Sequence, residues 1–88
     1  MTKIEYKKLF EECVNSGETM VLNLIYVSLI SSDRVTDLES CNKSLDELQK
    51  MREALTICDI DQVVKEEWKK RIEMGLEICE RDRESYLN

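Results

Sequence analysis

Residues 20–30 read Met-Val-Leu-Asn-Leu-Ile-Tyr-Val-Ser-Leu-Ile, and only Asn23 and Ser28 among them are polar. The chain as a whole is very different, since 36% of its residues are charged. A helix on the surface of a protein keeps a polar face, so a helix that is apolar on nearly every side is expected to be surrounded by protein. We therefore predict that residues 20–30 form the central, buried helix of the fold.

The chain has 88 residues, with no proline and only two glycines. A chain of this length forms one domain, because division into several domains requires considerably more than about 150 residues. The absence of proline leaves long helices uninterrupted. The sequence therefore predicts a single all-α domain that spans residues 1–88.

Apolar residues recur at intervals of three and four on both sides of the central run, as they do on one face of a helix. Asn15-Ser16-Gly17 is expected to end the first helix, and Ser31-Ser32-Asp33 to cap the third. Asp59 and Gln62 have the spacing of a capping box, which indicates the start of a fourth helix. We predict helices at about residues 3–15, 18–31, 34–57 and 60–85.

The last two helices are long and are separated only by a short break near Cys58, so we expect them to form an antiparallel hairpin. The predicted fold is a small bundle of about four helices, in which two short N-terminal helices pack on this long hairpin. Gly75 lies within the apolar stripe of the last helix, and glycine at such a position indicates the close approach of another helix. The β-branched residues of 20–30 also suit a strand, which is the alternative for that segment.

Two short helices of about 20 Å cannot cover a hairpin whose helices are about 35 to 40 Å long. Some apolar surface of the hairpin is then left over, and a second copy of the chain would cover it. We predict a homodimer on these grounds. The expected self-association residues form a seam at Leu38, Leu45, Leu48 and Leu55, or a second group at Trp68 and Ile72.

The four cysteines, Cys13, Cys41, Cys58 and Cys79, lie far apart in the sequence, without a CxxC pair and without any histidine in the chain. Structural zinc sites usually have closely spaced ligand pairs, so buried free thiols are favoured over a four-cysteine zinc site or disulfides. Reduced thiols indicate a cytoplasmic protein. We expect no bound metal and no cofactor.

The net charge of −6 is unfavourable for non-specific contact with nucleic acid or with an anionic membrane surface. The apolar run of residues 20–30 is also too short to span a bilayer, which takes about 20 residues. Acidic proteins attract basic surfaces. The composition thus favours a basic protein as the partner.

The chain lacks histidine, the commonest general base, and it has no glycine-rich phosphate-binding loop. No catalytic triad can be assembled without that base. Lys65, Lys69 and Lys70 surround Trp68 as they would in a base-stacking site, but glutamates alternate with them, and Trp68 lies in the apolar stripe. We therefore expect neither an enzyme nor a dedicated nucleic-acid-binding protein.

Five glutamates of the last predicted helix project within an arc of about 60°. One interpretation is a solvated face balanced by the pairs Glu66–Lys70, Glu67–Arg71 and Glu77–Arg81. The other is a docking ridge for a basic protein surface, and a divalent-metal site is a third, weaker interpretation. We take these residues as the candidate partner-binding site and call them the carboxylate ridge: Glu66, Glu73, Glu77, Glu80 and Glu84.

Taken together, these patterns predict a non-catalytic protein-binding module, an acidic inhibitor or adaptor that acts by protein–protein contact. The alternative is a small regulatory protein that acts on nucleic acid.

Overall fold

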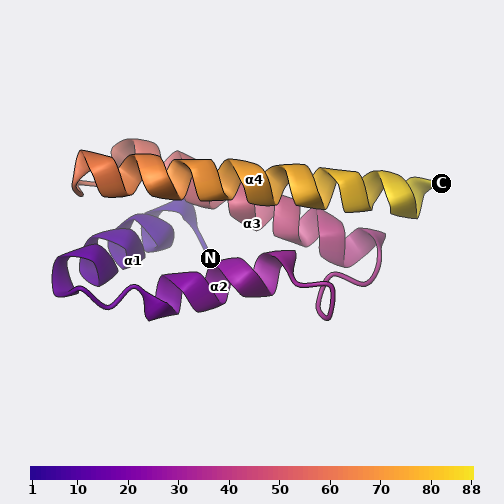
Figure 1. Ribbon diagram of the computed structural model, residues 1–88, viewed down its shortest axis with the longest axis horizontal. Helices are drawn as coiled ribbons and strands as arrows, with labels where there is room; N and C mark the ends of the chain where they lie inside the picture. The colour runs from indigo at the N-terminus through magenta and orange to yellow at the C-terminus, as the bar shows by residue number, and fades with distance from the viewer.

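The computed structural model describes all 88 residues and contains four helices and no strand. Helices α3 and α4 form an antiparallel hairpin, and α1 and α2 lie along it, in a molecule that measures 42 × 20 × 20 Å (Figure 1). The predicted all-α bundle is confirmed. The helices are α1 (Lys3–Ser16), α2 (Met20–Ile30), α3 (Leu38–Ile57) and α4 (Gln62–Leu87).

The first helix begins and ends where its sequence predicts. The Thr2 side chain accepts a hydrogen bond from the Glu5 backbone amide, and the Glu5 carboxylate accepts one from the Thr2 amide, which completes a capping box. Gly17 ends α1 with a φ of 78°, a left-handed conformation that glycine adopts without the strain of a side chain.

The start of α3 was predicted wrongly, at residue 34 rather than at Leu38. The chain first makes a turn in which the Ser31 carbonyl accepts from the amides of Arg34 and Val35, and the Val35 side chain is buried. The cap is Asp37, whose carboxylate accepts from the Ser40 amide at 2.8 Å. Burial of Val35 thus delays the helix until the next residue that can cap it.

The predicted cap of α4 is also wrong, because Asp61 and not Asp59 accepts from the amides of the first turn, at 2.9 Å from Val63. The Asp59 amide instead donates to the Glu11 carboxylate at 2.8 Å. This contact fastens α1 to the turn between α3 and α4.

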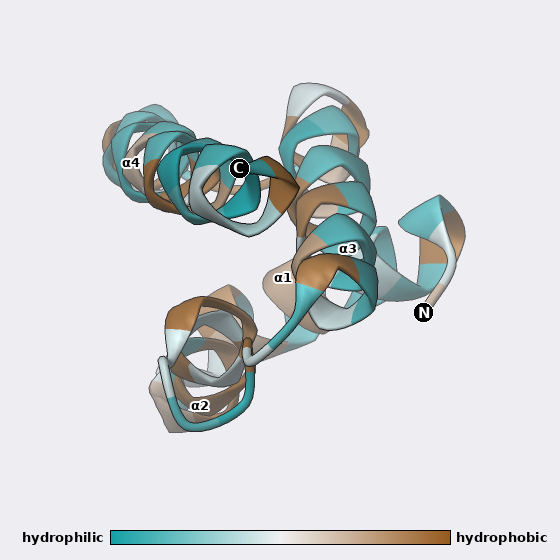
Figure 2. Cartoon of the chain, turned by 90° about the vertical axis from the view of Figure 1, so that its right-hand side faces the viewer, coloured by the Kyte–Doolittle hydropathy of each residue, from teal (hydrophilic) through white to brown (hydrophobic).

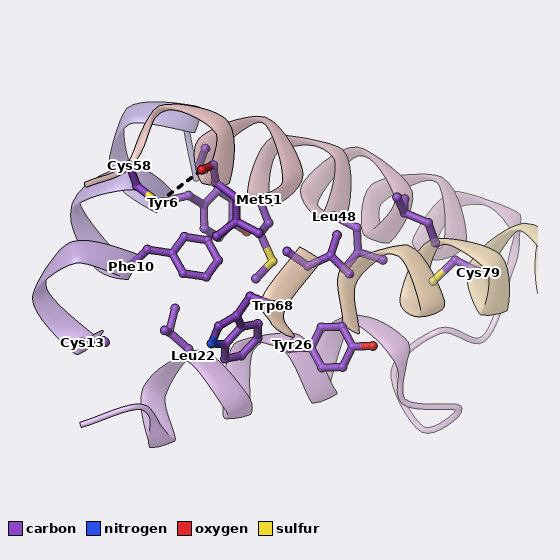
Figure 3. Close-up of a cluster of buried hydrophobic side chains, with 14 of the residues drawn as sticks. Tyr6, Phe10, Cys13, Leu22, Tyr26, Leu48, Met51, Cys58, Trp68 and Cys79 are labelled. Carbon is purple, nitrogen blue, oxygen red and sulfur yellow. Dashed lines mark hydrogen bonds between the residues drawn. The ribbon is translucent and has the colours of Figure 1, made fainter. Parts of the chain in front are cut away.

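The core lies between the hairpin and the two shorter helices, and its centre is aromatic (Figure 3). The Trp68 ring meets Phe10 edge-on at 5.7 Å and Tyr26 edge-on at 6.1 Å between ring centroids. Gly75 lets α2 approach α4, since a Cβ there would lie 3.0 Å from Tyr26 Cε2 and 3.2 Å from Ile30 Cγ2. The predicted close approach at Gly75 is confirmed.

The prediction that residues 20–30 form the central, buried helix is wrong. Only Leu22 and Tyr26 of α2 are buried. In Figure 2, α2 lies at the edge of the bundle and brown colours much of its circumference. The hairpin helices bury their stripes against each other, so α2 covers only what remains and has no neighbour on its outer side. The side chains left on this outer side are Met20, Val21, Leu24 and Val27, with 72%, 46%, 65% and 51% of their surface exposed.

The residues expected to mediate self-association lie mainly inside a single chain. Leu48, Leu55, Trp68 and Ile72 are buried in the core, and Leu38 and Leu45 are partly buried. The apolar seam of α3 therefore packs within the bundle instead of forming an outer surface. The surplus apolar surface that the length argument required is on α2.

Candidate functional site

The carboxylate ridge follows the side of α4 that faces away from α2. Gly75 and Arg71 are the α4 residues that meet α2, through Tyr26 and Asn23. At 100° per residue, the five glutamates of the ridge lie about 140 to 180° around the helix from Gly75. The ridge and α2 are thus on opposite faces of α4.

Two of the five ridge glutamates have partners. Glu66 accepts a hydrogen bond from the Gln62 side chain at 3.0 Å, and the Glu73 carboxylate lies 3.7 Å from the Arg52 guanidinium of α3. The other three are exposed and form neither an ion pair nor a side-chain hydrogen bond. We call these three the outer carboxylates: Glu77, Glu80 and Glu84.

None of the three predicted pairs along α4 is formed. Arg71, expected to pair with Glu67, instead places its guanidinium 4.2 Å from the Trp68 ring centroid and 5.0 Å from that of Tyr26. It also donates to the Asn23 side chain at 2.7 Å. The ridge is consequently less neutralised than the pair pattern indicated.

Sequence reasoning missed the role of Arg71 in holding α2 against α4. An arginine three residues after a core tryptophan lies on the same side of the helix and can stack on the ring, which was the available signal. The Tyr26 hydroxyl donates to the Arg71 carbonyl, so α2 and α4 are joined by a second hydrogen bond at this point. Asn23, one of the two polar residues of the apolar run, is thereby explained.

A small basic cleft lies between α3 and α4, with a volume of about 270 Å³. Its cations come from both helices, which is why the pattern of α4 alone did not reveal it. Trp68, considered as a base-stacking residue, is buried and contributes no surface to this cleft. The lining residues are Arg52, Leu55, Thr56, Lys65, Glu66 and Lys69.

The four cysteines are buried free thiols, as the packing interpretation predicts. The Cys41 thiol donates to the Cys79 carbonyl at 2.9 Å, and the Cys58 thiol to the Leu55 carbonyl at 3.5 Å. Burial, with a smaller contribution from Cys41, raises the pKa of Cys79 to about 11. No three histidine, cysteine or carboxylate side chains converge as a metal site would require. That the protein binds no metal stays a prediction, to be checked by metal analysis with thiol titration.

Comparison with protein-family models, curated proteins and solved structures gives no match to this chain. None of the four helices is both long enough and apolar enough to cross a membrane. A functional proposal therefore depends on the charge and geometry of the chain's own residues.

Proposed function

We propose that this protein is a non-catalytic binding module, an acidic inhibitor or adaptor that engages the basic surface of another protein. The observation that carries the proposal is the set of outer carboxylates, Glu77, Glu80 and Glu84, which are exposed and unpaired on one face of α4. Its free thiols favour a reducing compartment, so we place this activity in the cytoplasm.

The outer carboxylates are held in a fixed row, because the opposite side of the same helical segment is anchored in the core. Leu76 and Cys79 are buried between the glutamates of the row, and the Cys79 carbonyl accepts from Cys41 of α3. A partner with matching cations thus meets preorganised charges and loses little conformational freedom at this surface. Complementary charge of this kind chiefly accelerates association and selects the partner.

The alternative function, action on nucleic acid, would use the basic cleft between α3 and α4. Three cations line it, yet Glu66 is among them and the Lys65 ammonium already donates to the Cys58 carbonyl at 2.9 Å. A chain with a net charge of −6 approaches phosphates against an unfavourable long-range field. We therefore favour the protein partner.

The proposal is tested by reversing charge at the outer carboxylates, as Glu77→Lys, Glu80→Lys and Glu84→Lys in one variant. The control reverses three exposed glutamates that also form no ion pair, as Glu12→Lys, Glu18→Lys and Glu53→Lys. Both variants carry the same net charge. Each is tagged, purified from the native host and compared with the wild type by mass spectrometry of the proteins that accompany it.

We expect one partner to accompany the wild type and the control but not the ridge variant. With the purified partner, the ridge variant should associate more slowly and with a weaker dependence on salt. Equal loss of the partner in both variants would contradict the proposal, since net charge alone would then explain binding. Recovery of a specific DNA or RNA without associated protein would favour the alternative, and turnover of a small molecule would exclude both.

A further inference from the structure

The outer face of α2 is apolar and has no partner within the chain. Met20, Leu24 and Val27 lie within about 60° of one another around the helix, with Val21 at the margin toward α1. Each of the four has about half or more of its surface exposed. Contiguous apolar surface of this kind on a small protein marks a site of interaction.

This face differs from the rest of the molecule because residues 20–30 include no Asp, Glu, Lys or Arg. The other three helices each carry several charged residues of both signs. A basic partner gains nothing from charge at the α2 face. A second copy of the same acidic chain, which would be repelled where carboxylates face each other, can approach here without such repulsion.

We infer that α2 is a self-association surface at which two copies of this chain pack their α2 helices together. A contact of one surface with its own copy is isologous, so a two-fold axis closes the assembly as a dimer. The predicted homodimer is thus assigned to α2 and not to the α3 seam. Loss of the polar edge groups from water is limited, because the Asn23 side chain is already bonded to Arg71 and the Ser28 hydroxyl donates to the Ile25 carbonyl at 2.7 Å.

The size of the face sets the strength of the dimer. A helix of 11 residues is about 16 Å long, and four apolar side chains on it cover less than the roughly 800 Å² per partner of a standard stable interface. The dimer is therefore reversible, with monomer and dimer exchanging in the range of about 10 µM to 1 mM.

Dimerisation at α2 leaves the carboxylate ridge free, because the ridge is on the opposite face of α4. Two copies joined at α2 present two ridges on the outside of the assembly, and a target with repeated basic sites would bind both with increased avidity. This consequence rests on the proposed function, whereas self-association itself does not.

Sedimentation equilibrium of the full chain from about 5 µM to 1 mM tests the inference. Leu24→Glu places a charge at the centre of the α2 face. Val63→Glu is the matched control, because Val63 of α4 is 67% exposed and Leu24 is 65% exposed. Circular dichroism checks that both variants keep the helical content of the wild type.

We expect the mass of the wild type to rise from 10.4 kDa toward twice that value with concentration. Leu24→Glu should weaken association at least about tenfold, and Val63→Glu should leave it unchanged. Higher salt should preserve or strengthen the dimer, because it screens repulsion between the acidic copies. The ridge variant Glu77→Lys, Glu80→Lys, Glu84→Lys should still dimerise, which separates this test from that of the proposed function.

A wild type that stays at 10.4 kDa at all concentrations would overturn the inference. Equal weakening by Leu24→Glu and Val63→Glu would also overturn it, since the contact would then not be specific to α2. A dimer that dissociates as salt is raised would point to ion pairs elsewhere on the surface and would do the same.

Discussion

Helices α2 and α4 show that the amount of apolar sequence and the amount of burial are different quantities. Nearly all residues of α2 are apolar, yet only Leu22 and Tyr26 are buried. Charged residues are frequent along α4, yet five of its residues are buried. The difference follows from position, because α4 is central and α2 is at the edge (Figure 2).

The buried residues of α4 recur every three or four positions, so they form one stripe that meets α3 on one flank and α2 on the other. Trp68, in this stripe, also reaches Phe10 of α1. In contrast, the apolar residues of α2 surround the helix, and its inner side alone finds neighbours. Periodicity thus tells which side chains are buried, whereas an uninterrupted apolar run shows only that water is unfavourable around it.

The largest effect is expected at the α4 side of this comparison, from Trp68→Ala. Trp68 is buried and packs edge-on against Phe10 and Tyr26. Its loss removes the side chain that joins three helices, and such substitutions cost about 3 to 5 kcal/mol. For a domain of this size, that is comparable with the whole free energy of unfolding. Urea denaturation followed by circular dichroism should find the variant largely unfolded, and a loss below about 1 kcal/mol would contradict a central role for Trp68.

A second prediction divides α2 itself into an inner and an outer side. Leu22→Ala should lower the free energy of unfolding by about 2 to 5 kcal/mol, because Leu22 is completely buried. Leu24→Ala, the same chemical change two residues later, should alter it by no more than about 0.5 kcal/mol. Both are measured by urea denaturation at low protein concentration, where the monomer predominates. Equal losses at the two positions would mean that α2 is buried on both sides, as its sequence alone suggested.

The features of this fold that sequence reasoning predicts are those set by neighbouring residues. Gly17 ends a helix, the cysteines fall on apolar stripes, and Gly75 marks a close approach, each of which depends on local spacing. The order and approximate length of the four helices follow from the same periodicity.

The features that it missed depend on which distant residues become neighbours. The start of α3 at Leu38 depends on burial of Val35, and the amide of Asp59 is bonded to Glu11 of α1 instead of starting α4. The pairing of the ridge was overestimated because Arg71 stacks on aromatic rings from two helices. The ridge itself is a property of one helix, so its arc was predictable, but its exposure and its freedom from partners were not.

A third prediction concerns the line along which α2 and α4 meet. Alanine is favoured over glycine inside a helix by about 1 kcal/mol, but a Cβ at Gly75 would lie 3.0 Å from Tyr26 Cε2. The Tyr26 ring is held in place because its hydroxyl donates to the Arg71 carbonyl. We expect Gly75→Ala to destabilise the protein by about 1 to 2 kcal/mol in net terms.

The control for this prediction is Met74→Ala, next to Gly75 but exposed, which should change the free energy of unfolding by less than about 0.5 kcal/mol. Tyr26→Phe removes the hydroxyl that would lie 3.1 Å from the new Cβ. The double variant Gly75→Ala, Tyr26→Phe should therefore lose less stability than the sum of the two single changes. A Gly75→Ala variant more stable than the wild type would contradict close packing at this crossing.

The smallest effect is expected at Glu47, where α3 meets α1, away from both helices of the comparison. Burial raises the pKa of Glu47, but hydrogen bonds from the Tyr6 hydroxyl and the N-terminal ammonium outweigh it, so the pKa lies below its ordinary value. A carboxyl whose pKa is lower in the folded state stabilises the fold above its unfolded pKa of about 4.3 and loses this contribution as the pH falls through the folded pKa. We expect Glu47→Gln to cost roughly 1 kcal/mol near neutral pH and progressively less in acid, measured by urea denaturation across pH.

Glu53→Gln is the matched control, because Glu53 belongs to the same helix but is exposed and forms no ion pair. It should leave the pH dependence unchanged. A Glu47→Gln cost that stays constant from neutral pH into acid would show that the charge of Glu47 contributes nothing, and that α1 is held on α3 by packing alone. That result would extend the lesson of α2 to α1, since both short helices would then be held on the hairpin by the fit of their buried side chains.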